Sequence, residues 1–216
     1  MNYLESLANP VINHATLASV LASYARPNDK ISDLIKKHQL VSLKRGLYLI
    51  ADSHQSSREL IANHLHGPSY VSRQWALSYY GLLTEQVSVV TSMCIGRSRQ
   101  IETTRGNFHY QAIPVSYYSV GIDSIQHDKI AFMMATPEKA LADLLLTTRK
   151  LRIQSTPAML SYLQDDLRLD SDDLVKLDAT CFYDYAQQGY KSTMLNHLGK
   201  AIDSLTKLFT TSTSKW

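Results

Sequence analysis

The sequence has few of the features that secreted, thiolate-metal and membrane proteins need. Only two of its 216 residues are cysteines, and Cys94 and Cys181 lie far apart, outside any Cys-x-x-Cys or Cys/His cluster. This argues against a disulfide framework, and we expect two reduced thiols. No apolar run approaches the roughly 20 residues that span a bilayer. The first seven residues, MNYLESL, lack the basic and apolar segments of a secretory signal, so we expect a cytoplasmic protein that contacts no membrane.

The sequence also lacks the short motifs of common enzymes. It has no glycine-rich phosphate-binding loop, no Gly-x-Ser-x-Gly turn and no His-Glu-x-x-His helix. Asp170 and Asp172 form an Asp-x-Asp pair, but residues 154–169 before it contain no glycine for the phosphate-contacting turn of a nucleotidyltransferase. His64 and His66 have no third metal ligand at useful spacing. We therefore expect no catalytic residues, no metal and no cofactor.

Positive charge gathers at the start of the chain. Six basic residues oppose three acidic ones up to Ile50, whereas 16 basic and 16 acidic residues balance from Ala51 onward, so the first segment carries the whole net charge of +3. A small module with its charge on one helix and one hairpin is typical of a DNA-binding domain, because phosphate contacts supply most sequence-independent affinity.

This first segment predicts two short helices and a hairpin. Apolar residues recur at helical spacing over 14–24, and Pro27 then interrupts the run. Asn28 is expected to cap a second helix, because its side chain can accept from the free backbone N–H groups of the first turn. Residues 40–43 and 47–50 are expected strands, joined by a tight turn in which Gly46 supplies a positive φ.

Helix, helix and basic hairpin in this order predict a winged helix-turn-helix. The residues expected to read or position bases are Asn28, Asp29, Lys30 and Asp33. The residues expected to hold phosphates are Arg26, Lys36, Lys37, Lys44 and Arg45. The alternative is a solvated basic turn in a module that contacts only protein.

Two phrases further along the chain are more distinctive. They are GPSYVSRQWALSYYGLL at 67–83 and ATPEKALADLL at 135–145. With RGLY at 45–48, they resemble the AbiEi family of antitoxins and transcriptional regulators from bacterial abortive-infection (type IV toxin–antitoxin) systems, over roughly residues 12–200. The resemblance implies a winged helix that represses its own operon. It also implies a C-terminal domain that counteracts a partner toxin, AbiEii, which is a nucleotidyltransferase-like enzyme.

Both phrases also have local interpretations. Residues 69–83 are expected to form a helix that Ser69 or Ser72 caps and Gly81 stops, with most of its aromatic side chains in the core. Thr136 and Pro137 are expected to begin a buried helix, because threonine caps well and proline suits the first helical position.

Between these helices the sequence predicts a small, mainly antiparallel sheet. The expected strands are 87–91, 99–103, 107–113 and 130–134. Arg97, Arg99 and Arg105 are a possible second basic patch, although an ordinary solvated edge strand is favoured. From residue 157 to about 209 the pattern is helical, with Asp170 or Ser171 as a cap, and the polar tail 210–216 is expected to fray.

The sequence thus predicts an α+β protein with two domains: a winged helix-turn-helix over 1–52 and an AbiEi-like antitoxin domain over 53–216. The expected partners are double-stranded operator DNA and an AbiEii-like nucleotidyltransferase toxin, with direct contact to the toxin left open. The alternative function is a protein-interaction module that does not bind DNA and neutralises a toxin through its C-terminal domain.

Overall fold

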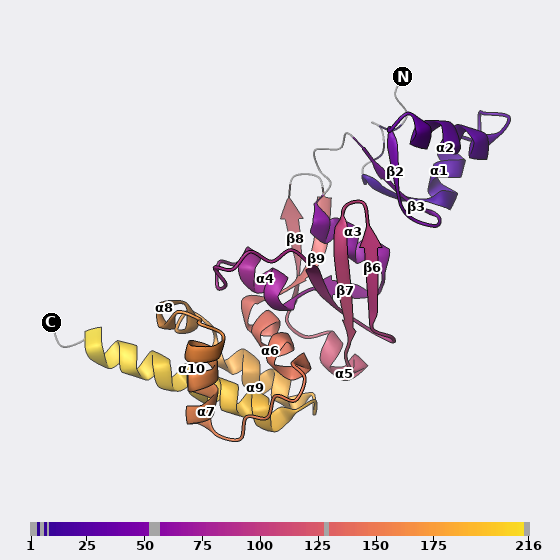
Figure 1. The fold of residues 1–216 in the computed structure, drawn as a ribbon. Helices are drawn as coiled ribbons and strands as arrows, with labels where there is room; N and C mark the ends of the chain where they lie inside the picture. The colour runs from indigo at the N-terminus through magenta and orange to yellow at the C-terminus, as the bar shows by residue number, and fades with distance from the viewer. Residues whose placement is uncertain (1–3, 5–6, 8, 52–56, 128–129, 214–216) are drawn as a thin grey trace.

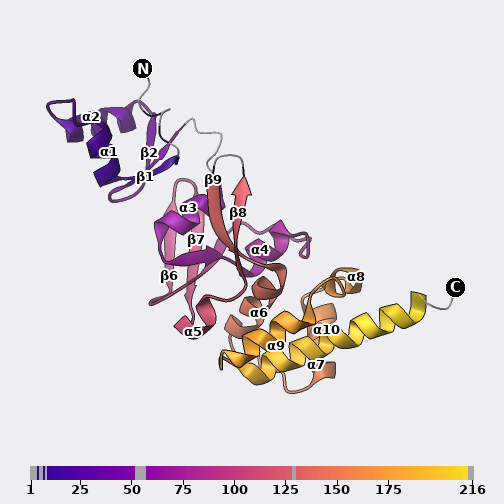
Figure 2. The same cartoon turned by 180° about the vertical axis from the view of Figure 1, so that it is seen from behind.

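A computed structural model describes residues 4, 7, 9–51, 57–127 and 130–213. The chain has the predicted α+β composition. A small N-terminal part with its own sheet lies at one end, a six-stranded sheet lies in the middle, and the C-terminal helices lie at the other end (Figures 1 and 2).

The N-terminal part contains the predicted helices and hairpin, and a strand that was not predicted. Its elements are β1 (Val11–Asn13), α1 (His14–Val20), α2 (Pro27–Lys36), β2 (Leu40–Lys44) and β3 (Leu47–Ile50). The central strand, β3, pairs antiparallel with β1 on one side and β2 on the other. The hairpin turn contains Gly46 at φ +77°, as predicted. Strand β1 was missed because three residues are too short to show an alternating pattern.

The cap predicted for α2 is wrong by two residues. The N-cap is Arg26, and Pro27 occupies the first turn of the helix. Proline has a fixed φ and no N–H to satisfy, so the helix begins at Pro27 and Asn28 lies inside its first turn. The Asn28 side chain instead places Oδ1 3.0 Å from Nε2 of His14, at the start of α1.

The small sheet is covered on both faces. On one face, Ile12 and Leu40 pack with Leu17 of α1 and with Ile31 and Leu34 of α2. On the other face, hydrophobic side chains of the three strands join the core of the larger part of the chain; they are Val11, Leu43, Leu47 and Leu49. Buried apolar surface therefore runs from the N-terminal part into the rest of the molecule.

The larger part is built on a mixed six-stranded sheet in the order β6-β7-β5-β4-β9-β8. Its strands are β4 (Ser69–Val71), β5 (Val90–Cys94), β6 (Arg99–Thr103), β7 (Gly106–Ala112), β8 (Ile122–His127) and β9 (Ile130–Ala135). The pairs β4–β5, β6–β7 and β8–β9 are antiparallel, whereas β4–β9 and β5–β7 are parallel. The sheet is thus larger than the predicted one by β4 and β8.

The helix predicted over 69–83 begins only at Arg73, with Ser72, one of the two expected caps, as its N-cap. Ser69–Val71 is strand β4, fully buried between β5 and β9, and the helix that follows is α4 (Arg73–Tyr79). Pairing on both sides outweighs the capping preference of Ser69. The helix stops where predicted, because Gly81 follows the C-cap residue at φ +79°. Helix α3 (Arg58–Leu65) precedes β4, and α5 (Val115–Tyr118) follows β7.

The C-terminal part is helical, as predicted. It comprises α6 (Pro137–Thr147), α7 (Thr156–Ser161), the π-helical turn η1 (Tyr162–Asp166), α8 (Ser171–Leu174), α9 (Ala179–Gln187) and α10 (Ser192–Thr213). Thr136 caps α6 and Asp170 caps α8, as predicted. Helix α10 continues into the segment expected to fray, and residues 214–216 lie outside the described residues.

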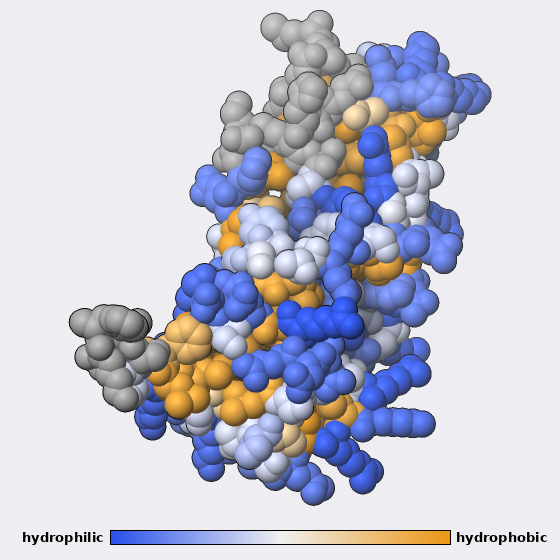
Figure 3. Space-filling view, turned by 60° about the vertical axis from the view of Figure 1, so that its left-hand side comes forward, coloured by the Kyte–Doolittle hydropathy of each residue, from blue (hydrophilic) through white to orange (hydrophobic). Residues whose placement is uncertain are grey.

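The last turns of α10 extend beyond the other helices (Figures 1 and 2). Apolar surface gathers at this end of the molecule, next to the C-terminal tail (Figure 3), and Leu208 there is 66% exposed. Helix α9 lies beside the first turns of α10, so this end is held by helix packing rather than by the sheet.

Candidate functional site

The outward surface of α2 carries charged residues of both signs. Arg26 lies 3.6 Å from Asp29, one turn further along the helix. Asp33 lies between two lysines, 3.8 Å from Lys30 and 3.0 Å from Lys37. The hydrogen bond from Lys37 is the main cause of a lowered pKa of Asp33. The two acids, Asp29 and Asp33, therefore pair with three of the six basic residues expected to contact DNA.

These pairs are exposed and exchangeable. Exposed ion pairs contribute little to stability, about 0–1 kcal/mol, because water screens them and the side chains lose entropy. Lys30 and Lys37 can therefore leave Asp33 for a phosphate at small cost. In the same contact Asp33 would repel the phosphates, unless it accepts a hydrogen bond from a base amino group.

Two other basic residues have no such partner. Lys36, on the last turn of α2, and Arg45, at the hairpin tip, are exposed, and neither forms an ion pair or a side-chain hydrogen bond with the described residues. Lys36 and Arg45 are thus the cations of this surface that are best placed to bind an anion.

Lys44 is placed differently from Arg45. Its Nζ donates a hydrogen bond to the backbone carbonyl of Leu65, at the end of α3. Asn9 and His64 make a second contact between the N-terminal part and α3, with Nδ2 3.1 Å from Nε2. Lys44 was predicted to hold a phosphate, but in this structure its ammonium group forms a hydrogen bond between the N-terminal part and α3.

The three arginines of the possible second basic patch do not come together. Arg97 lies in the loop before β6, Arg99 is the first residue of β6, and Arg105 lies in the turn after β6. At about 3.3 Å per residue, β6 spans roughly 13 Å from Arg99 to Thr103, and Arg105 lies in the turn beyond that end. Strand β6 is at the edge of the sheet, in agreement with the edge-strand interpretation.

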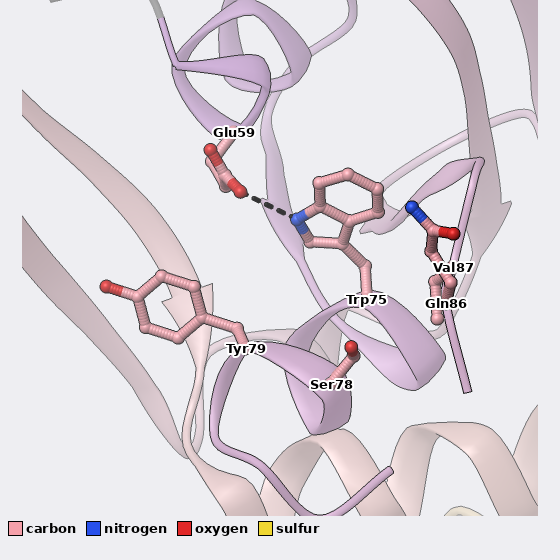
Figure 4. Close-up of a pocket in the computed structure, with 6 residues that line it drawn as sticks. All are labelled: Glu59, Trp75, Ser78, Tyr79, Gln86 and Val87. Carbon is pink, nitrogen blue, oxygen red and sulfur yellow. Dashed lines mark hydrogen bonds between the residues drawn. The ribbon is translucent and has the colours of Figure 1, made fainter. Parts of the chain in front are cut away.

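A small cavity lies between α3, α4 and the segment before β5 (Figure 4). Its volume is about 200 Å³. Its lining residues are Glu59, Trp75, Ser78, Tyr79, Gln86 and Val87. The indole Nε1 of Trp75 donates to Glu59 at 2.8 Å, and the Arg58 guanidinium lies 4.6 Å from the ring centroid. The polar groups of Trp75 and Glu59 are thus hydrogen-bonded to each other, as Figure 4 shows. The volume of the cavity is also below the range that is typical of small-molecule sites.

A buried polar cluster joins α6 to the sheet. Nζ of Lys139 lies 3.2 Å from Oδ1 of Asp143, and both side chains are 0% exposed. The hydroxyl of Tyr70 donates to Oδ2 of Asp143 at 2.9 Å, and that of Ser72 does so at 2.6 Å. Lys139 also donates to the carbonyl of Tyr117 at 2.9 Å. Tyr70, Ser72, Lys139 and Asp143 belong to the two distinctive sequence phrases, and Tyr117 contacts them.

Burial governs the protonation of this cluster. It lowers the pKa of Lys139 to about 8, although the charge of Asp143 opposes this shift. It raises the pKa of Tyr70 and of Tyr117 well above the ordinary value, and the Asp143 charge adds to that effect. With neither charge in contact with water, the cluster is suited to holding α6 in place rather than to exchanging protons with a substrate.

Sequence reasoning missed this cluster, although one signal was present. From Ala140 to Leu146 the only polar residue is Asp143, so α6 has no polar face, and a helix that is apolar all round is buried. Lys139 and Asp143 are four residues apart and hence lie on one side of that helix. The same pattern therefore predicts a buried ion pair.

Comparison with known proteins supports the fold and goes no further. No family model and no curated protein matches the chain. Among solved structures, the chain is similar to the RV2827C protein from Mycobacterium tuberculosis, with a TM-score of 0.51 and 13% sequence identity over 94% of this chain and 78% of that one. It shares that fold. Because the match spans 94% of this chain, it includes the N-terminal part and the larger part together.

The described residues form neither a membrane-spanning helix nor a cluster of metal ligands. Within the described residues, no helix combines the length and apolar character needed to cross a bilayer. In the same part of the chain, His, Cys, Asp and Glu side chains form no group of three or more that could hold a metal ion. His64 contacts Asn9, and His66 packs edge-on against Tyr110 with ring centroids 5.1 Å apart.

Proposed function

We propose that this protein is a DNA-binding transcriptional repressor that regulates its own operon and acts as the antitoxin of an AbiEi/AbiEii-like pair. One observation carries the DNA-binding part. The N-terminal part runs strand, helix, helix, hairpin, with β1 paired beside β3, and α2 is followed directly by a hairpin with a basic tip. This arrangement supports a winged helix-turn-helix in which α2 is the recognition helix and β2–β3 is the wing.

The charges favour a particular docking mode. Recognition helices place their N-terminal residues over base edges, which would bring Asn28 and Asp29 to the major groove. Lys36 and Arg45 would then lie at the two sides of the contact, on flanking phosphates. Both cations lack a partner in the described part of the chain, so no ion pair has to break before they bind.

The antitoxin part rests on the sequence resemblance and on where its motifs lie. The phrases at 67–83 and 135–145 supply Tyr70, Ser72, Lys139 and Asp143, which bond to one another in the core. The motifs thus hold together the domain that would counteract the toxin. A protein-interaction module that neutralises a toxin without binding DNA is the competing function.

The DNA-binding proposal is tested by fluorescence anisotropy on a labelled duplex from upstream of the gene, across a salt series. The intact chain is expected to bind with a log–log salt slope of about −5, because each neutralised phosphate contributes about −0.9. The double variant Lys36→Ala/Arg45→Ala is expected to lose about two units of that slope. A matched double variant, Arg97→Ala/Arg99→Ala, removes the same charge from β6 and the loop before it, and should bind as the intact chain does.

A flat salt dependence for the intact chain would decide against DNA binding. An equal loss of slope in both double variants would decide against α2 and the hairpin as the DNA-contacting elements. The antitoxin part has its own test, because the intact chain and the Lys36→Ala/Arg45→Ala variant should both relieve growth arrest by a co-expressed AbiEii-like nucleotidyltransferase. Failure of both to do so would remove the antitoxin role and leave the repressor role standing.

A further inference from the structure

A larger cavity adjoins the one in Figure 4, with which it shares Gln86 and Val87. Its volume is about 390 Å³, within the range of about 300–1,000 Å³ that is typical of small-molecule sites. It lies between the start of α4, the segment before β5, and strands β5 and β7, away from the proposed DNA-binding surface.

Arg73 is the unusual residue of this cavity. It lies at the first position of α4 with φ +58°, a left-handed conformation that is strained for any residue with a side chain. Its Nε is shielded from solvent and has no hydrogen-bond partner, and among the described residues its side chain forms no ion pair within bonding distance. Burial lowers the pKa of Arg73, and the charge of Asp143 opposes that shift.

Backbone strain and a shielded guanidinium nitrogen without a partner are two separate costs at the half-buried Arg73. Residues that bear such costs cluster at ligand-binding sites, where the ligand supplies the missing interaction. The neighbouring residue, Gln74, also has an unsatisfied polar atom, because its Oε1 is buried without a hydrogen-bond partner. Both side chains line the same cavity.

The remaining lining residues define what would fit beside Arg73. Aliphatic walls are supplied by Leu83, Val87 and Val89. Polar groups are supplied by Gln86, Ser88, Thr91 and His109. Glu85, the acidic residue of the lining, is exposed and forms no ion pair with Arg73, and its charge disfavours a second anionic group on a ligand. The cavity combines one unpaired cation, amide groups and an apolar wall.

We propose that this cavity binds a small molecule of mononucleotide size, with one phosphate group on a ring-shaped or apolar body. The planar guanidinium of Arg73 matches two phosphate oxygens at once, which makes arginine a preferred phosphate ligand. The amides of Gln74 and Gln86 bind polar edges of the body, and the aliphatic wall packs against its face. This activity is independent of the proposed DNA binding.

The test is isothermal titration calorimetry on the full chain with AMP, UMP and inorganic phosphate. We expect both nucleotides to bind, and inorganic phosphate to bind at least about tenfold more weakly, because it lacks the body that fills the apolar wall. Arg73→Gly should weaken nucleotide binding by about tenfold or more, the value of a lost charge-assisted contact.

Arg73→Gly also separates binding from folding. Glycine adopts φ +58° freely, so the melting temperature should not fall. Lys150→Gly is the matched control, because Lys150 is an exposed cation at φ +60° outside this cavity, and its removal should leave nucleotide binding unchanged. The proposal is overturned by any of three results: no heat with any probe, equal binding by the Arg73→Gly variant, or inorganic phosphate binding as tightly as the nucleotides.

Discussion

Lys139 lies one helical turn from Asp143 on α6, and neither side chain reaches solvent. Removing two charges from water costs several kcal/mol per ion, and the attraction between them offsets this only if every other polar group in contact is bonded. Here the second oxygen of Asp143 accepts from Tyr70 and Ser72, and Lys139 donates to the carbonyl of Tyr117, whereas the Tyr117 hydroxyl is buried without a partner among the described residues. The cluster holds α6, β4 and α5 in one arrangement.

The protonation of Lys139 makes stability depend on pH in a defined window. The unfolded chain keeps this proton up to about pH 10.5, whereas the folded chain releases it near pH 8. Between these values the unfolded state binds more protons, so the contribution of Lys139 to the free energy of unfolding rises with pH. From pH 8 to 9.5 we expect a rise of about 1–2 kcal/mol.

Urea unfolding of the natural chain and of Lys139→Met across this range measures the effect. The difference in free energy of unfolding between the two chains should grow with pH, because tyrosine titration is common to both and cancels. A difference that stays constant from pH 8 to 9.5 would mean that Lys139 releases no proton in that range.

The burial of Lys139 and Asp143 could be predicted from the sequence, but their hydrogen-bond partners could not. The apolar run after Lys139 shows that α6 has no polar face, and this places Lys139 and Asp143 inside. Nothing local connects them to Tyr70 or Ser72, more than 65 residues earlier, because that contact depends on how β4 is placed in the sheet.

Elements were predictable where the local signals agree. The hairpin of β2 and β3 follows from apolar strands around Gly46, and α6 follows from Thr136 and Pro137. Strand β4 was predicted as helix because Ser69 is a favourable cap, and only its two neighbouring strands decide otherwise. Strand β8 was missed because it is an exposed edge strand with polar residues at most positions.

On helix α2, one acidic residue limits how much positive charge is available to bind an anion. Asp33 lies within 4 Å of Lys30 and Lys37. If α2 contacts DNA, Asp33→Asn frees both lysines and removes a charge that repels phosphate. We expect affinity for a duplex of scrambled sequence to rise about threefold near 0.1 M salt, with a steeper salt slope.

Anisotropy titrations with the scrambled duplex and the upstream duplex measure this effect. Asp123→Asn on β8 is the control, since it makes the same charge change on another element, and it should bind as the natural chain does. Lower affinity of Asp33→Asn for the scrambled duplex would contradict the assignment of α2 as the DNA-contacting helix. A gain on the scrambled duplex with a loss on the upstream duplex would identify Asp33 as a base contact.

In the whole molecule, the N-terminal part is fastened to α3 by apolar packing and by two polar contacts. The polar contacts are Asn9 to His64 and Lys44 to the carbonyl of Leu65. Lys44 and Arg45 are adjacent in sequence and equally charged, yet only Lys44 bonds across to α3. We therefore expect Lys44 to contribute to stability and Arg45 to contribute to DNA binding.

Substitution of each residue by alanine tests this separation. Lys44→Ala should lower the melting temperature by about 2–4 °C, the effect of roughly 1 kcal/mol on a chain of this size, and change the DNA salt slope little. Arg45→Ala should leave the melting temperature within about 1 °C and reduce the salt slope by about one unit. An equal loss of slope in both variants would make Lys44 a phosphate contact as well.

The position of β4 has a consequence for how the chain is made. This strand pairs with β9 through Val71 and Met134, so the middle of the large sheet stays open until β9 has left the ribosome. The sheet of the N-terminal part is closed by residues up to Ile50 alone. At about 5–20 residues per second, synthesis from Ala51 to Ala135 takes roughly 4–17 s. During that interval the nascent chain carries the three paired N-terminal strands, one face of which still lacks its apolar cover, together with an exposed half-sheet. It is during this interval that the chain is most open to aggregation and to chaperones.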